Sequence, residues 1–230
     1  MQLPGIILVV FSDTSPIKSE LAFEGAPDAL LDPSCTDPGN QPPWRFRAGA
    51  VVVWKSATST FVPADDPTGD RNQPATVTAL VAADATWAGK NVEINFDGGP
   101  TVVVPLGAQS NTNALVIADL LKDLHVAGNL LVDEFNGLLR ARTTEAGAEK
   151  SIKINMPALA TAFGAAGTLG AGVDADYRVT LADGDLIDDS GAPAKSVVTC
   201  CRKAHFNTAK LRNLTPEAKM VLLRRGAFFG

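Results

Sequence analysis

The sequence predicts a mainly β protein with minor α content (α+β), built as a β-rich body with an inserted ββαβββ domain. Apolar residues alternate with polar ones in several short runs, and only two segments carry the caps and spacing of a helix. Composition also changes after the turn-rich segment 65–74, which predicts the insertion. The 230-residue chain is long enough for one large or two modest cores, and its 46% hydrophobic content excludes wholesale disorder.

The body is predicted to comprise residues 1–74 and 174–230. The first segment holds an N-terminal arm and a hairpin, and the second holds the last strands and a helix. Residues 24–43 are rich in glycine and proline, so we expect an extended loop or arm on a surface, placed to wrap a neighbour, rather than a regular element.

The inserted segment, residues 75–173, has its own pattern. It begins with a hairpin, turning at Asp97-Gly98-Gly99, whose alternating apolar residues are Val92, Ile94, Phe96, Val102, Val104 and Leu106. A helix follows, capped by Asn111, Thr112 or Asn113 and ended by Gly128. A turn at 135–138 leads to strands around 139–142 and 152–156, and the glycine-rich segment 164–172 returns the chain to the body.

The C-terminal segment predicts a short helix followed by two aromatic residues. Thr215 is a good N-cap and Pro216 suits the first helical position. The face predicted to be buried carries Ala218, Val221 and Leu222. Phe228 and Phe229 then stand almost at the terminus, where they need a partner surface. We therefore predict that both belong to a contact with another subunit or a partner protein.

The apolar run near the N-terminus has two interpretations. It is too short for a membrane span and lacks the flanking residues of a signal peptide. It is either a buried core strand or an arm that orders against a partner. In the second case the partner-binding residues are Ile6, Ile7, Leu8, Val9, Val10 and Phe11.

Charge and cysteine content exclude several classes of function. The net charge is −5 with scattered Lys and Arg, so we expect no direct contact with nucleic acid. Cys35, Cys200 and Cys201 lack the spacing of a zinc site. We expect reduced, buried thiols, and a bond from Cys35 to the 200/201 pair, within or between subunits, remains an open alternative.

No pattern of residues predicts catalysis. The two histidines, His125 and His205, fall at a predicted helix end and in a strand-like segment. Acidic clusters at 65–66, 174–176 and 183–189 lack the spacing of a calcium loop and are expected to be solvated turns. We therefore predict no enzyme activity, no cofactor and no bound metal.

Three segments of the body form an ordered series of short motifs. They are the hairpin-like stretch from 47 to 64, the element Ala182-Asp-Gly-Asp-Leu-Ile-Asp-Asp-Ser-Gly191, and the C-terminal stretch from His205 to Phe229. In content and order they resemble phage head decoration (cement) proteins of the lambda D type. The resemblance implies a homotrimer, made in the host cytoplasm, that binds the major capsid protein on the outer surface of the virion, without nucleic acid or membrane.

The inserted segment is similar to a module found in flagellin-like proteins and in phage tail and sheath proteins. Matching positions run in order from Asn91 to Gly164. This similarity implies an outward-facing insertion in an assembled shell or filament, and it supports a rival interpretation as a tail tube, sheath or baseplate protein. A carbohydrate-binding surface protein is the third interpretation, and the sequence does not decide whether the inserted module binds host glycans.

Overall fold

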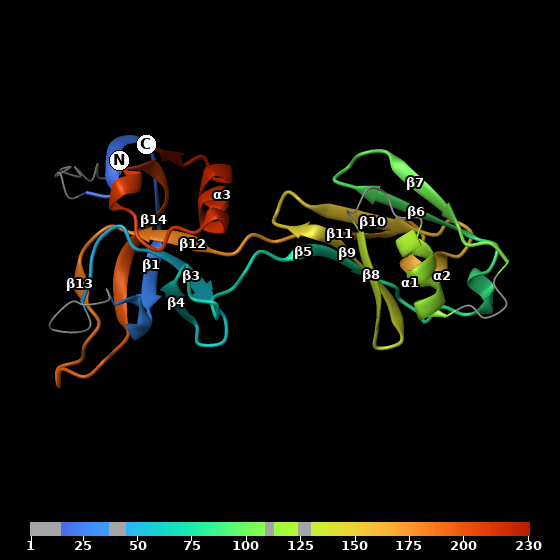
Figure 1. Ribbon diagram of the computed structural model, residues 1–230, viewed down its shortest axis with the longest axis horizontal. Coiled ribbons are helices and arrows are strands. Elements are labelled where there is room, and N and C mark those ends of the chain that lie inside the picture. The colour runs from blue at the N-terminus through green and yellow to red at the C-terminus, as the bar shows by residue number, and fades with distance from the viewer. Residues whose placement is uncertain (1–14, 37–44, 109–112, 124–129) are drawn as a thin grey trace, which may run out of the picture. The chain divides into compact units, whose positions relative to one another are not determined.

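The protein has a β-rich α+β fold made of two compact units, as the computed structural model shows (Figure 1). The structure describes residues 15–36, 45–108, 113–123 and 130–230. One unit, the body, comprises Met1–Asp70 and Ala175–Gly230, and the other, the inserted unit, comprises Arg71–Asp174. The sequence analysis placed the insertion at residues 75–173.

Five strands of the body close into a ring. The sheet order is β1-β4-β3-β12-β14-β15, and β1 pairs with β14 as well as with β4. Its strands are β1 (Ile17–Leu31), β3 (Val51–Lys55), β4 (Thr60–Pro63), β12 (Tyr177–Thr180), β14 (Ser196–Phe206) and β15 (Phe228–Phe229). The ring leaves β15 at an open edge, where it pairs in parallel with β14.

Strands β3, β4 and β12 are buried on both faces, which explains their short continuous apolar runs. In β3, Val51 and Val53 face a core that includes helix α3 (Pro216–Arg224), whereas Val52 faces a second core. Cys200 and Cys201 divide between the two cores in the same way. The second core is completed by η1 (Pro33–Cys35) and by the short pair β2 (Arg45–Phe46) and β13 (Gly184–Asp185). A further 3-10 turn, η3 (Thr208–Lys210), follows β14.

The prediction of an irregular arm over residues 24–43 is wrong for its first part. Strand β1 continues to Leu31 and pairs with β14, and η1 follows it. The register shifts between Ala26 and Ala29, so Pro27, which has no N–H to donate, lies at an irregularity of the ladder. Residues 37–44 lie outside the described part of the chain.

Two sheets share one core in the inserted unit. One sheet has the order β11-β10-β6-β7 and the other has the order β5-β9-β8. The elements are β5 (Pro74–Thr78), η2 (Ala85–Trp87), β6 (Asn91–Phe96), β7 (Thr101–Pro105), α1 (Ala114–Asp123), β8 (Leu130–Phe135), β9 (Leu138–Ala146), β10 (Ser151–Asn155), α2 (Ala160–Phe163) and β11 (Thr168–Ala171). Helix α1 packs beside β8 (Figure 1). Trp87, Ile117, Leu139 and Ile152 belong to the shared core.

The predicted ββαβββ series corresponds to β6, β7, α1, β8, β9 and β10. Both predicted turns are present, with positive φ at Asp97 and Gly98 and at Asn136 and Gly137. Strands β5 and β11 and helix α2 are additional. Strand β11 lies in the stretch expected to be a glycine-rich return, and a Cβ added at its Gly170 would lie 2.2 Å from the Thr76 carbonyl oxygen. Glycine here permits close packing of two backbones.

Candidate functional site

The C-terminal helix has the predicted caps. The Thr215 Oγ1 accepts a hydrogen bond from the Ala218 N–H at 3.1 Å, and Pro216 occupies the first turn. Ala218, Val221 and Leu222 are buried against the body core, as the helical spacing predicts. Because its buried face fixes α3 on the sheet, the helix also fixes the direction in which the last residues leave it.

The two terminal aromatics have different environments. The Phe229 ring packs on the body core, with its centroid 5.6 Å from that of Phe206, and the Lys219 ammonium lies 5.5 Å from the Phe229 centroid. Phe228, on the opposite side of β15, is 58% exposed. Met220 and Leu223 on α3 are also about half exposed. The prediction that both aromatics need a partner surface therefore stays open for Phe228, whereas Phe229 has a partner within its own chain.

The other predicted partner-binding residues, Ile6 to Phe11, lie outside the described residues. The described chain begins at Ser15, whose Oγ accepts a hydrogen bond from the Ile17 N–H at 3.2 Å. Ile17 is buried in the body core and opens β1. The described chain is therefore anchored in the body from Ile17 onward.

An ion-pair cluster in the body was not foreseen from the sequence. The Asp176 carboxylate pairs with Arg178 at 2.7 Å, with Arg202 at 2.9 Å and with Arg225 at 3.5 Å. The expectation of a solvated turn at 174–176 is wrong for Asp176, because strands β12 and β14 and the end of α3 bring three guanidinium groups around it. Burial raises the pKa of this carboxyl, but the hydrogen bonds from Arg178 and Arg202 outweigh burial, so the net pKa is lowered.

Arg178 is the most buried member of this cluster. Its Nη1 donates to the Pro27 carbonyl oxygen at 2.6 Å, and its guanidinium lies 4.3 Å from the centroid of the Phe61 ring. These contacts, together with the Asp176 carboxylate, compensate the buried Arg178 guanidinium for the loss of its hydration. The cluster therefore ties β1, β4, β12, β14 and α3 together.

The three cysteines are free in the structure, and all three are buried, as the sequence analysis expected. Cys35 and Cys200 lie in the same core, whereas Cys201 lies in the other. The Cys35 Sγ donates to the Phe61 carbonyl oxygen at 3.3 Å. Burial raises the pKa of all three thiols, that of Cys200 to about 12, so they stay protonated at neutral pH.

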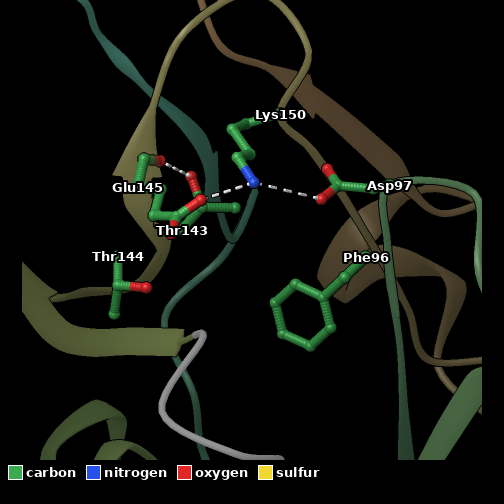
Figure 2. A pocket seen from close by; sticks show the side chains of 6 residues that line it. All are labelled: Phe96, Asp97, Thr143, Thr144, Glu145 and Lys150. Carbon is green, nitrogen blue, oxygen red and sulfur yellow. Dashed lines mark hydrogen bonds and ion pairs between the residues drawn. The ribbon is translucent and has the colours of Figure 1, made fainter.

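A small polar pocket in the inserted unit surrounds Lys150. Figure 2 shows its ammonium between two carboxylates, 2.6 Å from Glu145 Oε2 and 3.8 Å from Asp97 Oδ2. The hydrogen bond to Glu145 raises the pKa of Lys150 above its ordinary value. A lysine held protonated in this way is neither a general base nor an amine nucleophile. Since Asp97 follows β6 and Glu145 belongs to β9, the ammonium links the two sheets.

A second polar pocket lies on the outer face of the β11-β10-β6-β7 sheet. It is lined by Glu93, Asn95, Thr101, Lys153 and Asn155. The Asn155 Nδ2 donates to Glu93 Oε2 at 3.2 Å, while its Oδ1 is buried and accepts no hydrogen bond. An unsatisfied buried acceptor is unusual in a folded protein and marks a place where a donor is missing.

The remaining predicted sites concern histidines, metals and membranes. His125 lies outside the described residues, and His205 is a half-buried residue of β14. In the described part of the chain, no group of three His, Cys, Asp or Glu side chains is placed to hold a metal ion. Among the same residues, no helix is both long and apolar enough to cross a membrane. Comparison with known proteins gives no match to a family model, to a curated protein or to a solved structure.

Proposed function

We propose that this protein is a non-enzymatic structural protein of a phage virion, a decoration (cement) protein that binds the outer surface of the capsid and stabilises the shell. The exposed side chain of Phe228 at the open edge of the body sheet carries the proposal. Exposed apolar residues at a sheet edge are typical of surfaces that bind another protein. The ordered series of segments that resemble decoration proteins supports it independently.

In this proposal the partners are the major capsid protein and further copies of the same chain in a homotrimer. The body provides two adhesive regions: the C-terminal end with Phe228, and the N-terminal segment from Ile6 to Phe11. A subunit that holds several capsid proteins at once stabilises the shell, because each further contact forms at high effective concentration after the first. The inserted unit is, in this proposal, displayed on the outside of the shell.

Binding to purified shells tests this function. The protein is mixed with expanded and unexpanded shells, and bound protein is measured by co-sedimentation. We expect saturable binding to expanded shells, with weaker binding by Phe228→Ser and no loss in the control Leu80→Ser, which changes a similarly exposed apolar residue of the inserted unit. Absence of binding to either shell would contradict the proposal.

The same preparation distinguishes the rival tail function. Decoration predicts trimers that bind shells, whereas a tail tube or sheath protein forms sixfold rings or filaments. Analytical ultracentrifugation and electron microscopy of the free protein separate these two outcomes.

A further inference from the structure

The pocket on the outer face of the β11-β10-β6-β7 sheet is built from two adjacent rows of side chains. In antiparallel strands, residues directly opposite each other point to the same side of the sheet. The strand register places Leu169, Lys153, Asn95 and Thr101 in one row. It places Asn155, Glu93 and Val103 in the next row. The opposite face of the same strands is buried in the core, so the pocket rests on a rigid base.

Hydrogen-bonding capacity in this pocket is left unused. The amide of Asn155 is oriented by its donor bond to Glu93, which leaves its buried Oδ1 without a donor. Because protein atoms cover this oxygen, Asn155 contributes to the pocket through its bond to Glu93, and a Cβ added at the neighbouring Gly167 would lie 2.8 Å from the Asn155 Cβ. Asn95 uses its Nδ2 on the Gly99 carbonyl oxygen and keeps its own oxygen free.

The hydrogen-bond donors of the pocket are also available to a ligand. Within the described part of the chain, Lys153 makes no ion pair and the Thr101 hydroxyl makes no hydrogen bond. Glu93 and Lys153 balance each other in charge, so the pocket has no net charge. It therefore offers one ammonium and one hydroxyl beside several acceptor oxygens, which a charged ligand of either sign would not match.

We propose that this pocket binds one neutral sugar unit. A sugar hydroxyl both donates and accepts, so a ring of hydroxyls can donate to the Asn95 and Glu93 oxygens and accept from Lys153 and Thr101. Val103 and Leu169 stand in the same two rows, 53% and 67% exposed, and provide apolar contact for the C–H faces of the ring. This proposal does not rest on the capsid function, because it uses only groups of the inserted unit.

The dimensions of the pocket fit a single ring. Three strands and two rows span roughly 10 Å by 7 Å, given the usual spacing between strands and between alternate residues of a strand. No aromatic ring lines the pocket, so stacking does not contribute, and affinity is expected on the order of millimolar.

Titration of the full chain, followed by NMR of its backbone amides, tests the site. The probes are glucose, galactose, mannose and N-acetylglucosamine, each raised to about 50 mM to exceed a millimolar dissociation constant. We expect saturable shifts with at least one sugar, centred on the amides of β6 and β10 around Asn95 and Asn155. Asn95→Ala should weaken this binding at least about tenfold. Asn91→Ala, on the same face of β6 but outside the pocket, should leave it unchanged.

Several outcomes would overturn the proposal. They are no saturable shift with any of the four sugars, shifts that map outside β6 and β10, and equal binding by the Asn95 variant. A fourth is saturation by glycine without saturation by sugars, which would assign the pocket to a zwitterion. Thr101→Ala, at an exposed position, provides a second variant should Asn95→Ala fail to fold.

Discussion

Asp176 illustrates how one carboxylate determines the stability of the body. Its side chain is 26% exposed and pairs with Arg178, Arg202 and Arg225. Replacing Asp176 by Asn would leave three clustered guanidinium groups without their anion, one of them inside the strand ring. We expect Asp176→Asn to lower the free energy of unfolding by about 2 kcal/mol, less than for a fully buried pair because of the partial exposure. Urea denaturation at pH 7 measures this, with Asp28→Asn, at an exposed position of β1, as the control.

The same residue predicts a pH dependence. The pKa of Asp176 in the folded protein lies below its ordinary value of 3.8, so its contribution is fully present above that value. The contribution is lost as the pH falls through the lowered folded pKa, because the carboxyl then binds a proton in both states. Wild-type stability should therefore fall more steeply below about pH 4 than that of Asp176→Asn. Parallel slopes in the two proteins would contradict this role.

The cysteines give a second prediction at the level of residues. Because burial raises the pKa of Cys35, Cys200 and Cys201, their thiolate fraction at pH 8 is very small, and the cores cover the sulfur atoms. We expect the native protein to react only slowly with a thiol reagent such as Ellman's reagent, and all three thiols to react at once in guanidinium chloride. Rapid reaction of the native protein would mean that a core opens locally.

Among the elements, β15 carries one residue that contributes to folding and one that is proposed to bind a partner. Phe229 packs on the core and Phe228 is exposed, although the two are adjacent. We expect Phe229→Ser to lower the free energy of unfolding by about 2 kcal/mol, and Phe228→Ser to change it by less than about 0.5 kcal/mol. Thermal denaturation of the two variants tests the difference. If both variants unfold at the wild-type temperature, the terminal strand is not held on the body.

Elements with local signals were predictable from the sequence. The hairpin of β6 and β7 shows period-two alternation around a turn, and α3 shows its N-cap and buried face. Strand β1 was not predictable beyond Gly25, since its glycine and proline residues indicate a loop and only pairing with β14 keeps them extended. Strand β11 was missed for a similar reason, because Gly170 reflects a close approach to Thr76 that is remote in sequence.

Only one part of the proposed sugar site could be predicted from the sequence. The alternation of Glu93 and Asn95 with Val92 and Ile94 shows that a polar face exists on β6. The register that aligns this face with Lys153 of β10 depends on turns and packing throughout the sheet. The Asp176 cluster was missed for the same reason, because its arginines come from elements whose contacts only the folded chain defines.

For the whole molecule, the division into two units predicts independent folding. Each unit has its own cores, and residues 71–174 hold all members of the inserted core. We expect a variant in which a short Gly/Ser linker replaces residues 71–174 to stay folded, and the isolated segment to fold as well. Calorimetry of the intact chain, compared with the two parts, measures this. An unfolded body after deletion would show that the insertion supplies part of its stability.

Backbone hydrogen bonds join the two ends of the inserted unit, and this pairing affects how the protein can evolve. The Gln73 N–H donates to the Val173 carbonyl oxygen at 2.8 Å, and the Val173 N–H donates back to Gln73 at 3.1 Å. For the body, the insertion is equivalent to a short loop that closes at Gln73 and Val173. The entropy that the body loses in closing this loop therefore depends little on the length of the insertion. A different domain whose two termini lie close together could be inserted at the same two positions. Recombination could therefore replace the inserted domain, and with it the displayed surface, while the sequence of the body stays unchanged.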